Sequence, residues 1–597
     1  VVGDRLQANF SAEYKLLKDL SFKTTLGLSA TNNRTGEYWS TLLNRGRSYG
    51  GIGNISSSKR TNVASENYLS YNTTLASVHK IGAMGGYSYQ TYRNENWMAS
   101  GSKFITNAVS YWNLGGGAVT QIPSSGLTEG KLASFYSRVN YGFSDKYLLT
   151  FNARYDGSSN FSKNNKWAFF PSGAFAWNMK NEEFMRSVAV VNTWKWRASY
   201  GITGNQAIGP YQTLAGLSNV FSIVNGVAVN AVRPSTVAND DLTWETTAQL
   251  DFGTDIGLFD GRINFSADYY RMETSDLLFS VPLPQYSGYS SQLKNIGKVE
   301  NKGFEFTLSG KILTGQLKWN MDVNLSSNRN KVLELPDGKD ILYASGPGHL
   351  ISLGNTQILR VGAPVGSMYG YIYDGVYQVG DTFIPGSGFE QVAGGEKYRD
   401  IGGKLDADGK QTPDGKLDSN DQTIVGNPQP KFFYGFNNEF KFKSFDLNIF
   451  MQGSQGNDIL SYTLLELETL GKPINSTTRA LDRWTPTHTE TDVPKKTAAR
   501  SERVSTRWIF DGSYLRVKNI MLGYNMPKSV LDKLSISKLR LYVSAQNMLT
   551  ITNYRGFDPE VNYGGGGSGA QSNQNQGLDY ASYPNAKSYT VGLNIAF

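Results

Sequence analysis

The stretch from residue 398 to residue 422, YRDIGGKLDADGKQTPDGKLDSNDQ, concentrates the side chains best suited to hold a metal ion. Its five candidate ligands are Asp406, Asp408, Asp414, Asp418 and Asp421. Carboxylate oxygens at alternating positions on a glycine-bent loop are the ligands that Ca²⁺ takes. Residues 414–421 match the second half of a D-x-[DN]-x-[DN]-G loop, with Asp421 as the closing acid. The sequence predicts a calcium site here, although KQTP (410–413) interrupts the spacing and a solvated acidic turn is the alternative.

The remaining side chains give no pattern that is typical of catalysis. His79, His349 and His488 lie far apart in the sequence, and we expect them at the surface. The chain contains no H-E-x-x-H and no G-x-S-x-G, and no Gly-Lys pair is followed by Ser or Thr. It also has no cysteine, which removes thiolate nucleophiles and thiolate metal ligands. We therefore expect a protein that is not an enzyme and that requires no cofactor apart from the calcium ion considered above.

Aromatic side chains fall into two groups according to their expected position. Those near strand ends, such as Tyr147, Tyr155 and Trp319, are typical of rings at a membrane surface. A second group is expected in long loops, where the rings could stack on sugars or contact a partner: Tyr38, Trp39, Trp97, Tyr111 and Trp112. Packing of these loops against themselves is the alternative, so the five residues are candidate substrate contacts only.

The composition indicates which elements must position these groups. The chain has 64 Gly, 35 Tyr, 30 Phe and 11 Trp, which favours strands and turns over helices. Mean hydropathy is −0.39, and no apolar run approaches the roughly 20 residues of a membrane helix. A membrane β-barrel remains open, because its alternating strands average to a polar composition. The net charge of +8 is spread along the chain, so we expect no nucleic-acid partner.

Strand patterns recur along the chain with a period of two. Apolar residues alternate with polar or charged ones over 147–156, 262–270, 317–325 and 539–546. Successive strand side chains point to opposite faces, so each strand has one apolar and one polar face. A soluble sandwich would have to bury all the apolar faces in one core, and about 17 strands is unusually many for that. A barrel in lipid has no such limit, because its apolar face contacts acyl chains.

The connections between strands give an independent indication. Short links are expected near residues 18, 79, 145, 261, 315 and 444, and long ones over about 31–65, 94–130, 202–242, 329–430, 456–512 and 550–586. Short turns at one end and long loops at the other are typical of outer-membrane barrels. About 17 strands is an odd number, whereas bacterial single-chain barrels have an even number. We therefore expect residues 1–597 to be a single partial barrel domain whose first strands precede residue 1.

The last ten residues, SYTVGLNIAF, alternate to the end of the chain. Tyr589, Val591, Leu593, Ile595 and Phe597 share one face, and Thr590, Asn594 and Ala596 share the other. Most termini fray, so an end that stays inside a strand requires a reason. We predict that the first set faces lipid and that this strand closes a barrel.

Several segments closely resemble the SusC/RagA-type TonB-dependent transporters of Bacteroidetes. The C-terminal matches are SYLRVKNIMLGYNMP (513–527), LRLYVSAQNMLTITNYRGFDPEV (539–561) and SYTVGLNIAF. Upstream matches are WRASYGITGNQ (196–206), LTWETTAQLDFGTDIGLF (242–259), NIGKVENKGFEF (295–306), GSMYGYIYDGVYQ (366–378) and VGNPQPKFFYGFNNEFKF (425–442). They cover essentially the whole chain in the family's order, which makes the resemblance far more specific than any single motif.

The resemblance implies an all-β, antiparallel transmembrane barrel of about 22 strands in the bacterial outer membrane. It implies active import of a large nutrient, a glycan fragment or a peptide, beneath a SusD-like lipoprotein lid and in contact with outer-membrane lipid and lipopolysaccharide. TonB, energised by ExbB and ExbD, would act through an N-terminal plug. That plug, the TonB box and about five strands match no residue of this sequence, so their roles cannot be carried over to it. Phe597 resembles the terminal aromatic signal that the barrel-assembly machinery recognises.

Two other functions are compatible with the residues alone. A passive porin has the same wall but neither plug nor lid, and an upstream plug would reject it. A surface adhesin or soluble carbohydrate-binding β-protein would need no detergent for extraction. The substrate cannot be read from strands that form a wall, because selectivity lies in loops, plug and partner.

Overall fold

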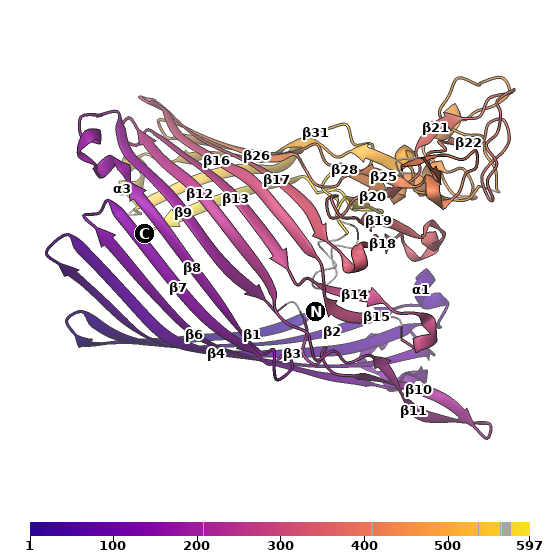
Figure 1. Ribbon diagram of the computed structural model, residues 1–597, viewed down its shortest axis with the longest axis horizontal. Helices are drawn as coiled ribbons and strands as arrows, with labels where there is room; N and C mark the ends of the chain where they lie inside the picture. Colours follow the sequence, from indigo (N-terminus) through magenta and orange to yellow (C-terminus); the bar gives the residue numbers. More distant parts are fainter. Residues whose placement is uncertain are drawn as a thin grey trace. The chain divides into compact units, whose positions relative to one another are not determined.

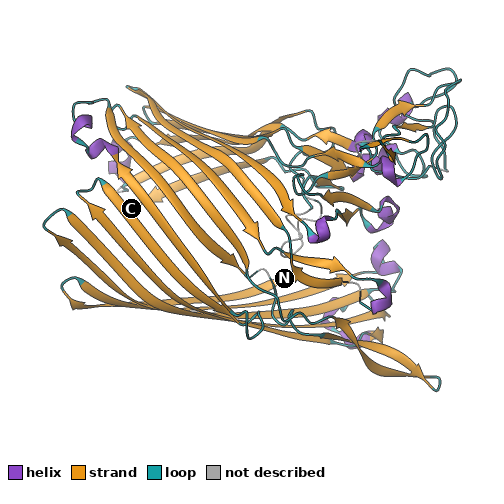
Figure 2. Ribbon diagram, viewed as in Figure 1, coloured by secondary structure: helices purple, strands orange, loops and turns teal. Residues whose placement is uncertain are grey.

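The computed structural model describes residues 1–206, 208–289, 291–406, 410–498, 500–534, 536–561, 563 and 575–597. Nearly all of its regular structure is strand, and helix is confined to short segments between strands (Figure 2). Within the described ranges, no helix is long and apolar enough to cross a bilayer. Eighteen of the described strands belong to one large sheet, in which every pairing with a defined register is antiparallel. The predicted all-β class is therefore confirmed.

The chain divides into two compact units, and unit 1 comprises residues 1–178, 198–249 and 274–296. Its long strands are β1 (Val2–Leu17), β2 (Leu20–Trp39), β3 (Ile52–Leu75), β4 (His79–Phe104), β6 (Ser124–Phe143), β7 (Tyr147–Ser158) and β8 (Trp167–Asn178). Its short elements are α1 (Asn44–Arg47), η1 (Ser110–Trp112), η2 (Leu114–Gly116), β5 (Gly117–Thr120), β10 (Gly216–Val224), β11 (Val227–Thr236), β14 (Leu278–Pro282), η5 (Gln285–Ser287) and β15 (Ser291–Asn295). The long strands run side by side in chain order, each paired with the next one along (Figure 1).

Unit 2 comprises residues 179–197, 250–273 and 297–597. Its long strands are β16 (Lys298–Thr314), β17 (Leu317–Glu334), β26 (Phe432–Phe442), β27 (Phe445–Gln455), β30 (Tyr514–Asn525), β31 (Lys538–Thr552) and β33 (Ser588–Ala596), again paired in chain order. Three further strands contribute residues to both units: β9 (Val191–Asn205), β12 (Glu245–Leu258) and β13 (Ile263–Ser275). The helices η3 (Met179–Asn181), η4 (Glu183–Met185) and α3 (Lys528–Leu534) lie in turns between strands.

Most of the short elements of unit 2 lie in the three long segments that separate its strands. Between β17 and β26 these are η6 (Pro336–Gly338), β18 (Ile341–Ser345), η7 (Gly348–Leu353), β19 (Asn355–Leu359), β20 (Met368–Gly370), β21 (Tyr373–Val376), β22 (Glu396–Tyr398), β23 (Gly403–Leu405), β24 (Gln411–Pro413), η8 (Ser419–Asp421) and β25 (Thr423–Gly426). The other two segments hold β28 (Asp458–Ser461), α2 (Tyr462–Glu468), η9 (Thr478–Asp482), η10 (Thr506–Trp508), β29 (Ile509–Asp511) and β32 (Leu578–Asp579).

The three long segments of unit 2 share one hydrophobic core. Strand β28 pairs with β29 from its own segment and, in parallel, with β32 from the last one. Leu460 of β28 packs in a cluster of buried side chains from all three segments: Leu350, Met368, Leu460, Tyr462, Leu464, Leu465, Val504, Trp508 and Leu578. These segments therefore fold together instead of forming independent loops, because burying this apolar surface stabilises their contact.

The strand register confirms the predicted alternation. In unit 1, Phe10 is opposite Leu26, Phe135 is opposite Tyr87, and Phe151 is opposite Gly173, so that apolar side chains occupy one face. This apolar face is solvent-exposed; its large members include Phe10, Leu26, Leu69, Tyr87, Phe135, Phe151 and Phe169. The opposite, polar face carries arginine, asparagine, glutamine and serine. Soluble proteins rarely expose so continuous an apolar surface, and lipid is the medium in which it is stable.

The predicted strand count is also confirmed over the described residues. Of the 18 strands in the large sheet, β5 has only four residues, and the other 17 are the long ones named above. The short links near residues 18, 79, 145, 261, 315 and 444 coincide with the turns that join consecutive strands.

Two of the predicted loops are wrong in extent. Residues 31–65 were expected to be a loop, but β2 continues to Trp39 and β3 begins at Ile52. Similarly, β4 extends to Phe104, well into the predicted loop 94–130. The extra strand residues are mostly Ser, Asn, Thr and charged types, so they lack the apolar alternation on which the prediction rested.

Glycines on the polar face allow aromatic rings to lie flat across the β4–β6 ladder. Gly86 is opposite Tyr136, and a Cβ on Gly86 would lie 2.8 Å from that ring and 2.6 Å from Cβ of Tyr68. Its neighbour Gly85 points to the apolar face and has nothing within 4 Å of such a Cβ. The two positions therefore form a matched pair on one strand.

We expect Gly86→Val to destabilise the protein by about 1–3 kcal/mol, because the new side chain must displace Tyr136 from the ladder. Gly85→Val is the control and should have little effect, since its side chain enters open space. The midpoint of chemical unfolding, followed by tryptophan fluorescence, measures both. Equal midpoints for the two variants would contradict this account of the ladder.

Candidate functional site

The polar face of β3, β4, β6 and β7 in unit 1 presents side chains that can bind a ligand. Residues Asn62, Tyr92 and Gly130 form one row across this face, and Met84, Arg138 and Asn152 form another. Both rows lie on the same face, because Tyr92 and Met84 are an even number of residues apart on β4. Hollows open along this face.

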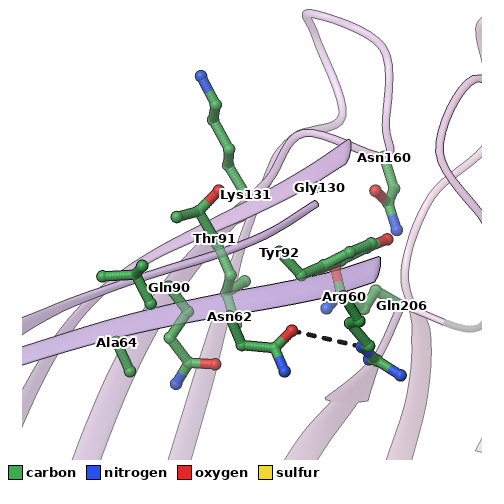
Figure 3. A pocket seen from close by; sticks show the side chains of 12 residues that line it. Arg60, Asn62, Ala64, Gln90, Thr91, Tyr92, Gly130, Lys131, Asn160 and Gln206 are labelled. Atoms are coloured by element: carbon green, nitrogen blue, oxygen red, sulfur yellow. Dashed lines mark hydrogen bonds between the residues drawn. The ribbon is translucent and has the colours of Figure 1, made fainter. Parts of the chain in front are cut away.

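The first hollow has a volume of about 220 Å³ and lies around Tyr92 (Figure 3). The ring of Tyr92 rests on Gly130, where a Cβ would lie 2.4 Å from it. The guanidinium carbon of Arg60 lies 6.0 Å from the ring centroid, and Arg60 Nε donates to Asn62 Oδ1 at 3.4 Å. In Figure 3, Lys131 points away from these groups, although it also lines the hollow. The hollow therefore combines the ring of Tyr92, which is held against Gly130, with the guanidinium group of Arg60, which can donate hydrogen bonds.

Side-chain amides complete the first hollow. Asn160 is buried, and its Nδ2 donates to the carbonyl of Ile208 at 2.8 Å. Gln206 Oε1 accepts a hydrogen bond from Ser158 at 2.5 Å. Gln90 and Asn62 line the remaining wall. An amide both donates and accepts hydrogen bonds, so this lining suits a ligand that is rich in hydroxyl groups.

The second hollow, of about 460 Å³, lies around Tyr136. Arg154 is paired with Asp156, since its Nε lies 2.8 Å from both carboxylate oxygens. Arg138 Nε donates to Asn152 Oδ1 at 2.6 Å, and Asn152 in turn donates to Ser172. A third hollow, lined by Lys80 and Asn140 among others, lies farther along the same strands, and Lys80 there is paired with Asp145.

The sequence analysis missed the residues of these hollows. They carry no motif, since arginine, asparagine and tyrosine are ordinary on the polar face of an alternating strand. One pattern in the sequence could have indicated them. Each occupies an alternate position of its strand that points to the polar face: Arg60, Asn62, Tyr92 and Arg138. Only the register between strands shows that they lie near one another.

The aspartate-rich segment lies in unit 2 on β23, β24, η8 and the turns that join them. Asp421 is buried, and its oxygens accept backbone N–H groups of Ile401, Gly402 and Asp418 at 2.8–3.1 Å. Asp418 caps η8 by accepting from the backbone of Asn420 at 2.7 Å. The structure therefore shows that these two carboxylates order the backbone.

The other three candidate ligands differ in how much the structure shows. Asp414 Oδ1 accepts the backbone N–H of Lys416, and Asp406 Oδ1 accepts that of Lys410. Asp408 lies outside the described residues. Among the residues that are described, no three or more His, Asp or Glu side chains converge as metal ligands do. Calcium binding by this segment stays a prediction.

The five candidate aromatic residues do not all lie in loops. Tyr38 and Trp39 are on β2 and Trp97 is on β4, so their placement in loops was wrong. Tyr111 and Trp112 lie on η1, within the connection between β4 and β6. The physical reason is the unexpected length of the polar strands described above.

These aromatic residues contact other parts of unit 1. The Tyr38 hydroxyl donates to Asn107 at 2.9 Å, and the guanidinium of Arg45 lies 3.9 Å from the ring centroid of Trp39. Trp112 contacts Tyr111, with 4.7 Å between ring centroids, and lies under Arg34. The contacts favour self-packing for Tyr38, Trp39 and Tyr111. Trp112 is 68% exposed, and Trp97 is 48% exposed but lies on the apolar face of β4, the face that also carries Tyr87.

A buried ionic cluster joins the first two long segments of unit 2. Arg500 Nε and Nη2 lie 3.0 and 3.1 Å from the two carboxylate oxygens of Glu390. Glu396 Oε1 lies 2.9 Å from Arg507 Nη1, and its other oxygen accepts from Tyr398 at 2.7 Å. Burial, together with the neighbouring Glu396 carboxylate, raises the pKa of Tyr398 far above its ordinary value. The tyrosine therefore stays neutral and acts as a donor.

A second buried cluster ties the last long segment to β30. Arg516 Nη2 lies 2.6 Å from Asp558 Oδ1, and Arg516 Nη1 contacts Glu560. Burial alone would raise the pKa of Asp558. Hydrogen bonds from the backbone of Asn585 and Glu560 and from Arg516 outweigh it and hold that pKa below its ordinary value. Asp558 is thus ionised, and its contact with Arg516 holds the last long segment against β30.

The C-terminal strand β33 pairs with β31, so that Leu593 is opposite Leu541 and Val591 is opposite Val543. The predicted lipid-facing residues are exposed: Tyr589, Val591, Leu593, Ile595 and Phe597. Phe597 follows the last residue of the strand and is 93% exposed.

Comparison with known proteins gives the family and the fold to which this arrangement is similar. Residues 2–548 match the family described as TonB dependent receptor-like, beta-barrel. The chain is 48% identical over 599 residues to TonB-dependent receptor P3 of Formosa agariphila, covering 100% of this chain and 58% of that protein. It is 31% identical over 486 residues to TonB-dependent receptor SusC of Bacteroides thetaiotaomicron, covering 79% and 44%.

A solved structure shows the same fold. The RagAB peptide transporter superposes with a TM-score of 0.84 at 26% sequence identity, over 100% of this chain and 62% of that one. The chain spans less than three fifths of the length of the curated relatives P3 and SusC. Activities that need the whole length of such a protein are therefore not shown by these residues alone.

Proposed function

Since this chain belongs to the TonB-dependent receptor-like β-barrel family, we propose that it forms the membrane wall of an outer-membrane importer for a large nutrient. The nutrient is a glycan fragment or a peptide, and TonB drives its passage with energy supplied through ExbB and ExbD. The family is one of transporters and receptors, and this wall performs no covalent chemistry. Its role is to bind ligand differently in the open and closed states.

One observation above all supports this proposal. The exposed apolar face and the polar face lie on opposite sides of the same strands, and the family match extends over these strands from residue 2 to residue 548. Lipid stabilises the first face and a water-filled passage the second. Polar hollows on the second face then line the path of the nutrient.

Uptake by whole cells tests the proposal. Cells that express the protein with its partners should accumulate a labelled oligosaccharide or peptide, and a protonophore or loss of TonB should reduce uptake to background. The host strain without the gene gives that background. Uptake that persists after the proton gradient collapses would identify a passive porin instead. Extraction of the protein without detergent would identify a soluble or adhesive protein.

A surface lipoprotein resembling SusD is the proposed partner, and hairpin β10–β11 offers a surface for it. Residues 216–232 contain no charged side chain, and Leu217, Phe221 and Ile223 are each more than two thirds exposed. The hairpin projects from unit 1 (Figure 1), and its turn uses Asn225 and Gly226 with positive φ, which favours a tight two-residue turn. An exposed apolar hairpin of this kind is typical of an interaction surface.

The uptake experiment therefore includes a second readout, co-purification of the lipoprotein. Replacing Phe221 and Ile223 with serine should abolish co-purification while the amount of barrel in the membrane stays unchanged. Leu481→Ser, at an isolated residue that is 80% exposed, is the matched control. Unchanged co-purification in the variant would show that the hairpin is not part of the interface. If no lipoprotein co-purifies with the parent protein, the proposed partner is wrong.

We also propose that the aspartate-rich segment binds Ca²⁺ when the ion is supplied. Calorimetric titration of the purified protein should show heat that is lost in Asp414→Ala, a residue whose carboxylate lies on an exposed turn. Asp340→Ala, at an exposed surface ion pair in the same long segment, is the control. Identical heats for the parent and Asp414→Ala would end the calcium proposal.

Phe597 is proposed as the assembly signal at the end of β33. Its deletion should lower the amount of protein in the outer membrane several-fold, because the signal for assembly is lost. The ring itself is exposed and contributes almost nothing to packing. For the protein that does assemble, the free energy of unfolding should stay within about 0.5 kcal/mol of that of the parent. Phe597→Ala and Tyr583→Ala form the matched comparison, because Tyr583 is an aromatic residue with the same 93% exposure, and the second change should leave surface levels unchanged. Unchanged surface levels without Phe597 would contradict the role.

A further inference from the structure

Charged side chains follow the exposed apolar residues along one face of β16 and β17 in unit 2. Successive side chains of a strand point to opposite faces, so Phe306, Phe304, Lys302 and Glu300 share one face of β16. Phe306 and Phe304 are 38% and 50% exposed, so this is the apolar face of the strand. Arg329 of β17 is opposite Lys302, and the two strands lie side by side (Figure 1). The apolar surface therefore continues into a row of charged residues.

Four cations of this row surround one carboxylate. The Glu300 side chain is 8% exposed, and its oxygens lie 2.7 Å from Arg271 Nε and 3.4 Å from Lys302 Nζ. The Arg271 and Lys302 side chains remain about half exposed. Lys331 is directly opposite Glu300, and both Lys331 and Arg329 are exposed. We call these four cations, together with Glu300, the basic row; its formal charges leave an excess of positive charge.

The surroundings of the basic row do not reverse its charge. Glu273 lies 3.0 Å from Lys298 Nζ and 3.8 Å from Arg271 Nη2, so the charges of Glu273 and Lys298 offset each other. Strand β16 has β13 and β17 as neighbours, and β17 has β16 and β26. The row therefore lies within a continuous part of the sheet.

The distance along β17 places the basic row just beyond a lipid hydrocarbon core. On the apolar face, every position from Leu317 to Leu325 is apolar, and Ser327 follows them opposite Phe304. From Leu317 to Ser327 the strand is about 33 Å long. Membrane strands tilt by roughly 35–45°, so this length spans about 25 Å, the height of the apolar band of such barrels. Arg329 lies about 7 Å farther along the strand, at the level of the lipid headgroups.

The other border of the same apolar face differs in charge. At the end with short turns, Leu317 is opposite Phe442 and Trp319 is opposite Phe440, so these positions carry no charge. Lys443 follows in the turn, with its Nζ 5.4 Å from the ring centroid of Phe442. The excess of positive charge thus lies at the border near the long segments. Basic residues are favoured beside an anionic membrane surface, which points to anionic headgroups in the leaflet on that side.

Unit 1 repeats this order of residues on its own apolar face. On β6, Phe135 is 52% exposed, and Lys131 lies on the same face and is exposed. Arg93 of β4 lies beyond them, 2.5 Å from Glu95 and 3.0 Å from Glu129. These two carboxylates offset the cations, so the excess of positive charge is smaller than in unit 2. The basic row of unit 2 is therefore the stronger candidate for contact with an anion.

We propose that the basic row binds the phosphate groups of a lipid in the outer leaflet. Lys302, Arg329 and Lys331 contact the phosphate oxygens, and the acyl chains lie along the apolar face that begins at Phe304. Phosphate offers several acceptor oxygens to the N–H groups of neighbouring arginine and lysine side chains. A lipid fits better than free phosphate, because the basic row and the apolar face are continuous. The proposal rests on the proposed membrane wall and identifies a lipid partner for it.

Native mass spectrometry of the purified full-length protein in detergent tests the proposal. The probe is lipid A with two phosphate groups, and lipid A without phosphate provides the same acyl chains for comparison. The parent protein should bind the phosphorylated form more tightly by about 10-fold or more. Inorganic phosphate at millimolar concentration should displace little of this lipid, because the free anion makes no contact with the apolar face.

Substitutions of the two lysines locate the site. The double variant Lys302→Gln, Lys331→Gln should weaken binding of phosphorylated lipid A by about 30-fold, at ~1 kcal/mol for each basic residue. Its binding of lipid A without phosphate should equal that of the parent. Lys302→Arg with Lys331→Arg keeps both charges and should retain the affinity of the parent. Lys443→Gln, at the other border of the apolar face, is the matched control and should leave binding unchanged.

Three outcomes would overturn the proposal. The parent could bind both forms of lipid A equally well, or the Lys302→Gln, Lys331→Gln variant could bind phosphorylated lipid A as tightly as the parent does. Complete displacement by inorganic phosphate would identify a site for the free anion instead. Binding by purified protein needs neither TonB nor a lipoprotein, so an active importer without this lipid preference would contradict only the lipid site. Extraction without detergent would contradict the membrane wall itself.

Discussion

Arg500→Met is expected to destabilise the long segments of unit 2 locally by about 3–5 kcal/mol, the usual cost of breaking a buried ion pair. The Arg500 side chain is 1% exposed and is paired through two nitrogens with Glu390. It also donates to the carbonyls of Thr469 and Lys495 at 2.5 and 2.7 Å. Methionine fills a similar volume but leaves one buried carboxylate and two carbonyls without these donors.

Hydrogen–deuterium exchange of peptides from residues 386–399 and 466–474 measures this loss. A cost of about 3–5 kcal/mol corresponds to exchange that is a hundred-fold faster or more, if local opening controls exchange. Arg360→Met is the control, because the Arg360–Asp340 pair is more than one third exposed on both sides and contributes about 0–1 kcal/mol. Similar exchange in the two variants would show that the buried cluster does not hold the segments together.

The strands were predictable because their physics is local. In 147–156 and 539–546, apolar side chains alternate with polar ones, and the structure confirms strands β7 and β31 there. Short turns were equally predictable: positive φ at Phe259, Asp260 and Gly261 marks a tight turn at the expected place. Alternation follows directly from a wall with lipid on one side and water on the other.

The length of β2, β3 and β4 was not predictable by the same reasoning. Residues 52–60 read IGNISSSKR and contain no alternation, yet they pair with β2 and β4 without interruption. Both faces of this region are polar, which is expected where strands continue beyond the lipid. Hydrophobic periodicity then gives no indication of a strand, and the strands are set by backbone pairing with their neighbours.

The binding face and the ionic clusters depend on contacts between residues that are distant in sequence. Glu390 and Arg500 are 110 residues apart, and in a single sequence both are typical of exposed loops. Tyr92 and Gly130 meet only because of the β4–β6 register. Pattern reasoning finds a strand from its own residues, but it cannot find which residue of another strand lies opposite.

Arg516→Met is expected to release the segment between β31 and β33 from β30. Arg516 is 2% exposed and contacts both Asp558 and Glu560, and its Nε donates to Thr550 at 2.9 Å. Glu560 retains Lys518 at 2.8 Å, so the main loss falls on Asp558, which is buried. We expect a local cost of about 3 kcal/mol, at the lower end of the range for a broken buried pair.

A double-mutant cycle separates the ion pair from the packing of the side chain. Asp558→Asn removes the carboxylate that Arg516→Met leaves unpaired, so the double variant should be less destabilised than the sum of the two single variants. Exchange of peptides covering 553–561 and 582–588 gives the free energies. The interaction should exceed about 1 kcal/mol, because both groups are buried and hydrogen-bonded. Strict additivity would show that Asp558 is held by the backbone of Asn585 and Glu560 without help from Arg516.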